Sequence, residues 1–401
     1  MATSDTSTAS RVGLALLLAA SSFTIMAAAS VAPALPDMRE AYASVPGVDV
    51  KVPLTLTLPG LVIAAAAPLS GLVADRWGRT RLLLAGLLLY AVSGVSGFFA
   101  ASLEGILIGR AFLGLAVAMI MTTVSVLIID YSRDIERWRM LGRQASIAGF
   151  GGLIFPLVGG VLAVGHWRLP FLLYLLPLFL VVPIYWYVRD VHLLKQGGRN
   201  EKDLTHFPVG DFLIAISLGF CGMLVLYAIP LMMPRLLQDL GANSAMAFGA
   251  AIGIPSCAAG ITAFFYSRIR SLFDVQTIAS IAFGLMAVSY ALISAARQVE
   301  LAIAFAMIAG VGFGLNTPNL TTWMQSRMPM AWRGRAAGAL TSAIFLGQFS
   351  AAFVYSRLER HASIGDVFFL VASSCFAVSA VAAAAVAVRW RPDCRVGNRR
   401  T

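Results

Sequence analysis

Twelve long apolar runs, separated by polar connections that are short with one exception, constrain this chain more than any other feature of its sequence. Each run is about 20 residues long, the length that an α-helix needs to cross a bilayer, whereas strands of a membrane barrel alternate over about 10 residues. The composition agrees, because 59% of the 401 residues are hydrophobic and only 12% are charged, with a mean hydropathy of +0.82. A soluble domain carries about 25% charged residues. We therefore predict an all-α membrane protein.

The predicted spans fall into two groups of six. A polar connection at 189–208 separates them and is predicted to be a cytoplasmic linker. Residues 1–188 and 209–388 would then form two six-helix bundles, and residues 389–401 a basic cytoplasmic tail. The expected spans are 12–35, 53–74, 82–101, 104–128, 144–165, 169–188, 209–233, 245–266, 275–296, 299–324, 336–356 and 365–388.

The basic residues predict the orientation of these spans. If the N-terminus is cytoplasmic, 22 of the 30 Lys and Arg residues fall in cytoplasmic segments and 7 in outer loops, which leaves Arg110 inside a span. This asymmetry satisfies the positive-inside rule, so we expect a multi-pass protein of the cytoplasmic (inner) membrane with both termini in the cytoplasm. The first apolar run resembles a signal peptide, but it continues to about Ala34, and its removal would invert every later loop. We expect it to be retained.

Several function classes are disfavoured by the residues present. The net charge of +11 is dispersed over short loops, whereas nucleic-acid binding needs basic residues gathered on one folded face. Neither the four cysteines nor the four histidines show metal-binding spacing, so we expect no metal and no other cofactor. A phosphate-binding GxxxxGK[ST] loop and a clustered Asp/His or Ser/Lys set are both missing from the sequence, which disfavours an ATP-driven pump and a membrane enzyme. A channel would need a filter loop, and none is recognisable.

The two halves are weakly similar in sequence. Gly142–Arg143 before the fifth span corresponds to Gly334–Arg335 before the eleventh, 192 residues later. The same offset carries Asp75–Arg76 onto Ser267–Arg268. Related halves that flank a central site favour alternating access over an open pore.

Small residues recur on one helical face in spans 2, 5, 8 and 11. Such stripes let helices approach closely and are common in membrane helices. Their presence in four corresponding spans favours sliding interfaces between the halves. The stripes are Gly60, Ala64 and Pro68; Gly152, Pro156 and Gly160, beside Gly151 and Gly159; Gly249, Gly253 and Cys257; and Ala339, Ala343 and Gly347.

The loop between spans 2 and 3 carries a recognisable motif. It closely resembles the signature loop of the major facilitator superfamily, G-x-L-x-D-R-x-G-R-[KR], with Val73 and Thr80 as departures. The matching residues are Gly71, Asp75, Arg76, Gly78 and Arg79. Glycines permit a tight turn there, and a carboxylate at the membrane boundary requires a partner.

Three further segments support this resemblance. Arg110 to Gly114 is similar to the family's fourth-span motif, and Asp130 with Arg143 is similar to its loop between spans 4 and 5. Residues 151–160 resemble the antiporter motif of span 5, with Phe155 in place of a glycine. The resemblance implies two pseudo-symmetric six-helix bundles, the major facilitator fold, with spans 1, 4, 7 and 10 around a central cavity. It also implies that Asp75, Arg79 and Asp130 form an inner gate.

Arg110 is the one basic residue well inside a span, and an intramembrane charge is a functional hypothesis by default. The acid best placed to meet it is Asp37, at the outer end of span 1. One hypothesis is that the two form a proton-responsive pair; the other is that Asp37 is a solvated cap and Arg110 a structural cation bonded to carbonyls.

Polar and aromatic residues in the cavity spans are candidates for solute contacts, although a residue of this kind alone is more often a packing or helix-pairing residue. They are Thr24, Thr122, Tyr227, Asn316, Asn319, Trp323 and Gln348. Because so few charges are available, a neutral or amphipathic solute fits better than a strongly ionic one.

The sequence thus predicts a secondary transporter that is not an enzyme. The leading hypothesis is proton-coupled export of a small molecule, such as a drug or metabolite. The alternatives are proton-linked uptake of a sugar or organic acid and, less favoured, a membrane enzyme. The expected partners are the solute, protons and membrane lipid, and we expect a monomer.

Overall fold

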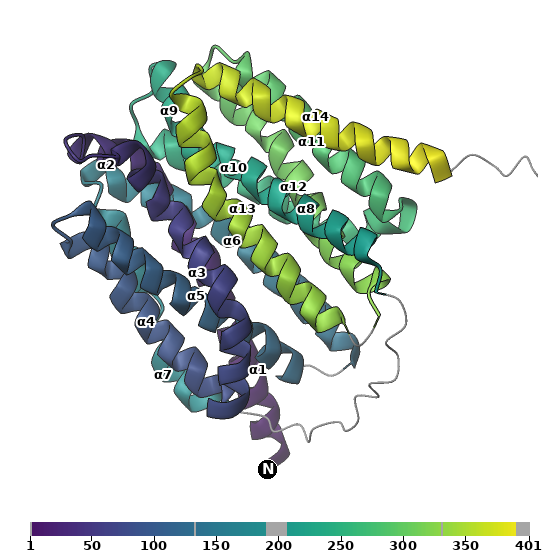
Figure 1. The fold of residues 1–401 in the computed structure, drawn as a ribbon. Coiled ribbons are helices and arrows are strands. Elements are labelled where there is room, and N and C mark those ends of the chain that lie inside the picture. The colour runs from purple at the N-terminus through teal and green to yellow at the C-terminus, as the bar shows by residue number, and fades with distance from the viewer. Residues whose placement is uncertain (1, 132–133, 190–206, 330–331, 390–401) are drawn as a thin grey trace, which may run out of the picture.

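The computed structural model of the chain describes residues 2–131, 134–189, 207–329 and 332–389, and all regular structure in these ranges is helical (Figure 1). The first half contains α1 (Ala2–Ala29), η1 (Ala32–Ala34), α2 (Leu35–Ala41), α3 (Val48–Trp77), α4 (Arg79–Phe99), α5 (Leu103–Tyr131), α6 (Asp134–Gly165), η2 (Leu169–Leu175) and α7 (Leu178–Tyr187). The second half contains α8 (Val209–Leu226), α9 (Ala228–Asp239), α10 (Ala245–Leu272), α11 (Val275–Ser294), α12 (Val299–Arg327), α13 (Arg333–Glu359) and α14 (Ile364–Arg389).

These helices make twelve spans when α1–η1–α2, η2–α7 and α8–α9 each count as one. Eleven of the spans in the described ranges are long and apolar enough to cross a membrane, and α6 has a shorter apolar part at Gly149–Gly165. The predicted all-α membrane fold is confirmed. The predicted linker and basic tail lie almost wholly outside the described residues, so the proposed domain bounds stay predictions.

The first span of each half breaks near one end. In the first half, η1 contains Pro33 and separates α1 from the short helix α2. In the second half, Tyr227 separates α8 from α9, three residues before Pro230. Proline lacks an N–H and crowds the carbonyl four residues earlier, which favours a break in the helix. The face of the molecule that carries α2 and α9 is called the outer face below, and the opposite face the inner face.

A matching contact in each half reflects their relationship. The hydroxyl of Tyr90 on α4 donates to the Phe23 carbonyl of α1 at 2.7 Å. The hydroxyl of Tyr290 on α11 donates to the Val225 carbonyl of α8 at 2.8 Å. In both halves the third span thus holds the first through a buried tyrosine.

The halves meet along two helix pairs, α3 with α13 and α6 with α10 (Figure 1). Three side chains of α13 donate to backbone carbonyls of α3. Ser356 bonds the carbonyl of Asp49 at 2.6 Å, Gln348 that of Leu56 at 3.2 Å, and Ser342 that of Ala64 at 3.0 Å. These bonds begin at the outer face and reach the middle of the helices.

Beyond Ala64 the same two helices diverge. Pro68 and Leu72, four and eight residues after Ala64 on the same side of α3, are exposed, Leu72 to 62%. A Cβ placed on Gly71 of α3 or Gly338 of α13 would find no atom within 4 Å. The structure is therefore closed between these helices at the outer face and separated at the inner face.

Candidate functional site

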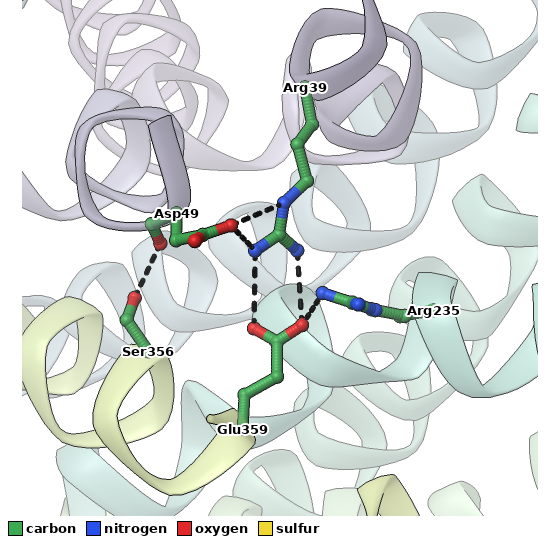
Figure 2. A network of polar contacts seen from close by, with 5 residues as sticks. All are labelled: Arg39, Asp49, Arg235, Ser356 and Glu359. Carbon is green, nitrogen blue, oxygen red and sulfur yellow. Dashed lines mark hydrogen bonds and ion pairs between the residues drawn. The ribbon is translucent and has the colours of Figure 1, made fainter. Parts of the chain in front are cut away.

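Four charged side chains join the two halves at the outer face, and we call them the outer ion cluster: Arg39 on α2, Asp49 on α3, Arg235 on α9 and Glu359 at the end of α13 (Figure 2). Arg39 donates to Asp49 through Nε at 3.1 Å and also through Nη2. Its Nη1 lies 3.1 Å from Oε1 of Glu359.

The second arginine reaches the same carboxylate. Arg235 lies in ion-pair contact with Oε1 of Glu359, although its Nη1 has no aligned hydrogen bond. The side chain of Glu359 is only 8% exposed. Glu359 is thus a nearly buried anion held between an arginine of the first half and an arginine of the second.

Arg110 lies fully inside the first half, with 1% of its surface exposed. Its Nη1 donates to the hydroxyl of Tyr174 at 2.7 Å and to the Ala27 carbonyl at 3.3 Å. The guanidinium carbon lies 4.8 Å from the ring centres of both Phe171 and Tyr174. Nη2 has no hydrogen-bond partner among the described residues.

Two glycines of α4 make room for the rings that hold Arg110. A Cβ on Gly94 would lie 2.3 Å from Tyr174, and one on Gly97 would lie 1.9 Å from Phe171. No side chain could occupy these positions without moving a ring. The two aromatic rings can therefore pack around Arg110 because α4 has glycines, without side chains, at these positions.

The hypothesised partner of Arg110 stands apart from it. Asp37 is half-buried on α2, where Glu40 and His166 are its charged neighbours. Arg110 instead reaches the carbonyl of Ala27, ten residues earlier and on the other side of the break at η1. Within the described part of the chain Arg110 makes no ion pair, so the predicted pair is not formed in this structure.

The loop between α3 and α4 lies at the inner face. Gly78 adopts φ +100°, a conformation that side-chain-bearing residues avoid, so a glycine is required at this turn. Arg79, which follows it, forms an ion pair with Asp130 at the end of α5. Arg76 and Arg143 are exposed, and the side chain of Asp75 lies outside the described part.

The glycine motif of α6 contacts two helices. A Cβ on Gly160 would lie 2.5 Å from the Ala245 carbonyl of α10, and Gly152 faces Ser256 of the same helix. Gly159 faces the turn that follows α1, where a Cβ would lie 2.0 Å from the Ser30 carbonyl. The remaining motif residues are Pro156, whose carbonyl meets Gly249 of α10, and Gly151, which lies near Phe155 and Ser22.

Most of the predicted solute contacts make helix–helix contacts in this structure. Asn319 donates to the Val275 carbonyl at 2.8 Å and accepts from Tyr266 at 3.1 Å. Trp323 donates to Asp211 at 3.2 Å.

Gln348 bridges to α3, and Asn316 is buried beside Gly222, with no partner for its Oδ1 in the described residues. Thr24 and Thr122 are half-buried and bond carbonyls of their own helices, and Tyr227 is buried at the α8–α9 junction.

Sequence reasoning missed the outer ion cluster. Arg39, Asp49, Arg235 and Glu359 lie far apart in the chain, and each is near a predicted span end where charges are ordinary. The sequence does contain one signal for the cluster. The outer ends of spans 1, 2, 7 and 11 carry two basic and two acidic residues, so their charges are balanced and could pair.

The structure has two related halves of six spans each. Charged side chains from both halves join them at the outer face, and the halves are separated at the inner face. This arrangement defines a polytopic membrane transporter. The family model of the Major Facilitator Superfamily matches residues 17–352. The chain belongs to this superfamily, and the resemblance predicted from the loop between spans 2 and 3 is confirmed.

Individual relatives are similar over part of their length. The uncharacterized MFS-type transporter YwfA of Bacillus subtilis is 28% identical over 231 residues, which cover 54% of each chain. Multidrug resistance protein 1 of the same organism is 34% identical over 105 residues, 26% of this chain and 27% of that one. The matched stretches thus span about half or less of these curated relatives. The crystal structure of a D-xylose–proton symporter has a TM-score of 0.77 at 16% identity, covering 95% and 97%, and shows the same fold.

Proposed function

We propose that this protein exports a small, neutral or amphipathic solute in exchange for protons. It would act as a monomer in the cytoplasmic membrane, with both termini in the cytoplasm and the outer face towards the exterior. The orientation rests on the excess of Lys and Arg in segments assigned to the inner face.

The observation that carries the ion-coupling proposal is Arg110. A guanidinium buried in a membrane helix costs free energy, and such groups are retained for function. Arg110 has only a hydroxyl, a carbonyl and two ring faces as partners in the described structure. A buried cation without an anion favours the charged form of any carboxylate that comes close to it. An acid that moves towards or away from Arg110 would therefore change its affinity for protons, which is the property that coupling requires.

Export is supported by two independent features. The antiporter-like motif of α6 lies where the halves meet, with Gly152 and Gly160 against α10. One relative carries the name Multidrug resistance protein 1, and a second similar protein is the quinolone resistance protein NorA of Staphylococcus aureus. The scarcity of charge in the spans favours a solute without strong charge of its own.

The inner loop has a proposed role in switching. Arg79 and Asp130 already form a pair at the inner face, and Asp75 lies in the last turn of α3, four residues before Arg79. We propose that Asp75, Arg79 and Asp130 take part in closing the inner face when the outer face opens.

The test is a panel of candidate solutes in proteoliposomes that contain a pH-sensitive dye and an imposed pH gradient. A solute of the exporter moves protons in the direction opposite to its own movement, and the Arg110→Lys variant should lose this coupling. Movement of solute and protons in the same direction would show uptake instead. Solute movement that is indifferent to the gradient would reject proton coupling.

A further inference from the structure

The outer ion cluster connects elements that must separate if the outer face is to open. Arg39 and Asp49 belong to the first half, and Arg235 and Glu359 to the second (Figure 2). We propose that Glu359 is an external proton site, and that protonation of its carboxylate releases the outer face. This inference goes beyond the proposed function, because it holds whether the solute is exported or taken up.

Protonation of Glu359 and opening of the outer face are coupled. In the closed state Arg39 and Arg235 stabilise the charged carboxylate, so Glu359 binds a proton more readily once the arginines have moved away, and acid therefore favours the open state. The groups that face the cluster are Arg39 from α2, Asp49 from α3, Arg235 and Asp239 from α9, and Arg360 beside Glu359 itself. Three cations therefore meet three anions. When Glu359 is neutralised, Arg39 and Arg235 face each other across the boundary between the halves without the anion that separated them, and like charges in close contact repel.

Glu359 is better placed for this role than Asp49. The Arg39–Asp49 pair lies within the first half, so its loss would break no link between the halves. The side chain of Asp49 is 42% exposed, so water screens its charge, whereas Glu359 is nearly buried. Of the four residues of the outer ion cluster, Glu359 is the acid that contacts an arginine from each half.

The backbone provides a means of movement. The two arginines are carried by α2 and α9, the short helices that breaks at η1 and Tyr227 separate from the long helices of their spans. Repulsion between Arg39 and Arg235 can therefore tilt α2 and α9 without unwinding α1 or α8. The outer ends of α3 and α13 would follow.

A buried reporter on α13 tests the proposal without any knowledge of the solute. Ala352 is fully buried and lies four residues from both Gln348 and Ser356, which bond α3, so it shares their face. Ala352→Cys is introduced after the four native cysteines are replaced by alanine, and intact cells are labelled with a membrane-impermeant maleimide. The rate is expressed relative to that of an exposed cysteine at the same pH, because the thiolate that reacts with maleimide becomes scarcer in acid. This relative rate should be low in neutral medium and higher in acidic medium.

The Glu359→Gln variant should be labelled at least about tenfold faster in neutral medium, a change equivalent to ~1.4 kcal/mol in the opening equilibrium. Its rate should no longer rise with acid. Arg235→Gln should also weaken the acid response, because no second cation then opposes Arg39 when Glu359 is protonated. Glu359→Asp, which keeps the negative charge, should retain the acid response.

The matched control is Glu104→Gln. Glu104 pairs with Lys51 at 2.5 Å, but α5 and α3 both belong to the first half, so labelling should equal that of the parent. The proposal is overturned if Glu359→Gln is labelled as slowly as the parent, if Glu104→Gln opens the reporter equally, or if acid still accelerates labelling of Glu359→Gln and Arg235→Gln. If only a membrane-permeant maleimide labels the cysteine in acid, and the impermeant reagent does not, the reporter does not open to the exterior and the proposal is also rejected. Each outcome is independent of the proposed export, which the solute panel tests separately.

Discussion

Replacement of Arg110 by methionine should abolish coupled transport while leaving the protein about as stable as before. Methionine has a similar length and fills the same space between Phe171 and Tyr174 without a charge. The substitution leaves no partner stranded, since the Tyr174 hydroxyl still donates to the Ala27 carbonyl at 2.8 Å and lies 3.1 Å from Oγ of Ser30.

The magnitudes of the opposing effects are similar. The charge-assisted hydrogen bond to Tyr174 contributes about 1.5–3 kcal/mol, and each of two cation–π contacts about 1–2 kcal/mol. Against these stands the desolvation of an ion, which costs several kcal/mol, and the ~2.5–3.5 kcal/mol found for arginine at the centre of a membrane helix is one measure of that same cost. The favourable and unfavourable contributions are therefore of similar size, and the net contribution of Arg110 to folding is near zero. We expect an unfolding free energy close to that of the parent protein.

The assay combines thermal unfolding in detergent with proton-coupled transport in proteoliposomes. Leu113→Met, at a buried position on the same helix, is the control for the change in packing and should affect neither measurement. A clear fall in thermal stability of Arg110→Met together with retained transport would refute the reasoning. Arg110 would then be a structural cation.

Three further predictions use the same two measurements. Gly160→Val should lower the unfolding free energy by about 1–3 kcal/mol and block transport, because its Cβ would lie 2.5 Å from a backbone carbonyl of α10. Gly210→Ala, with open space around it, should change neither measurement. Equal behaviour of the two variants would reject a close contact between α6 and α10. Tyr90→Phe should lower the unfolding free energy by about 1 kcal/mol through loss of the 2.7 Å bond to Phe23, and an unchanged melting curve would show that the bond contributes nothing. Asp37→Asn should keep both transport and its pH profile, because Asp37 makes no ion pair with Arg110 here; loss of the pH profile would show that the two meet in another state.

The sequence predicted the spans well because a helix in lipid must be apolar along its length. It predicted helix ends less well at the outer face, where the chain stays helical after apolarity has ended. The predicted first span ends at residue 35, but α2 continues to Ala41, and the predicted span 53–74 begins at Val48 as α3. Those additional turns carry Arg39 and Asp49. Arg235 and Glu359 likewise lie just beyond the predicted ends at 233 and 356, so the whole outer ion cluster lay outside the predicted spans.

The partner of Arg110 shows a second limit. A search for a counter-charge pointed to Asp37, the acid nearest to Arg110 among the cavity spans. The structure instead supplies a hydroxyl and two ring faces from η2, brought close because Gly94 and Gly97 on α4 have no side chains. Neutral groups that stabilise a cation leave no charge pattern in a sequence, so this site could be recognised only in three dimensions.

The two charged arrangements at the membrane faces differ in what they connect. Arg79 and Asp130 both belong to the first half, so their pair does not hold the halves together at the inner face. At the outer face, Gln348 and Ser356 join α13 to carbonyls of α3, and such bonds are indifferent to pH. At the outer face, the described part of the chain has one ion pair that joins the halves, Arg39–Glu359, and within the outer ion cluster only Glu359 contacts cations from both halves. If closure of the outer face responds to external acid through this cluster, Glu359 is therefore the group through which it does so.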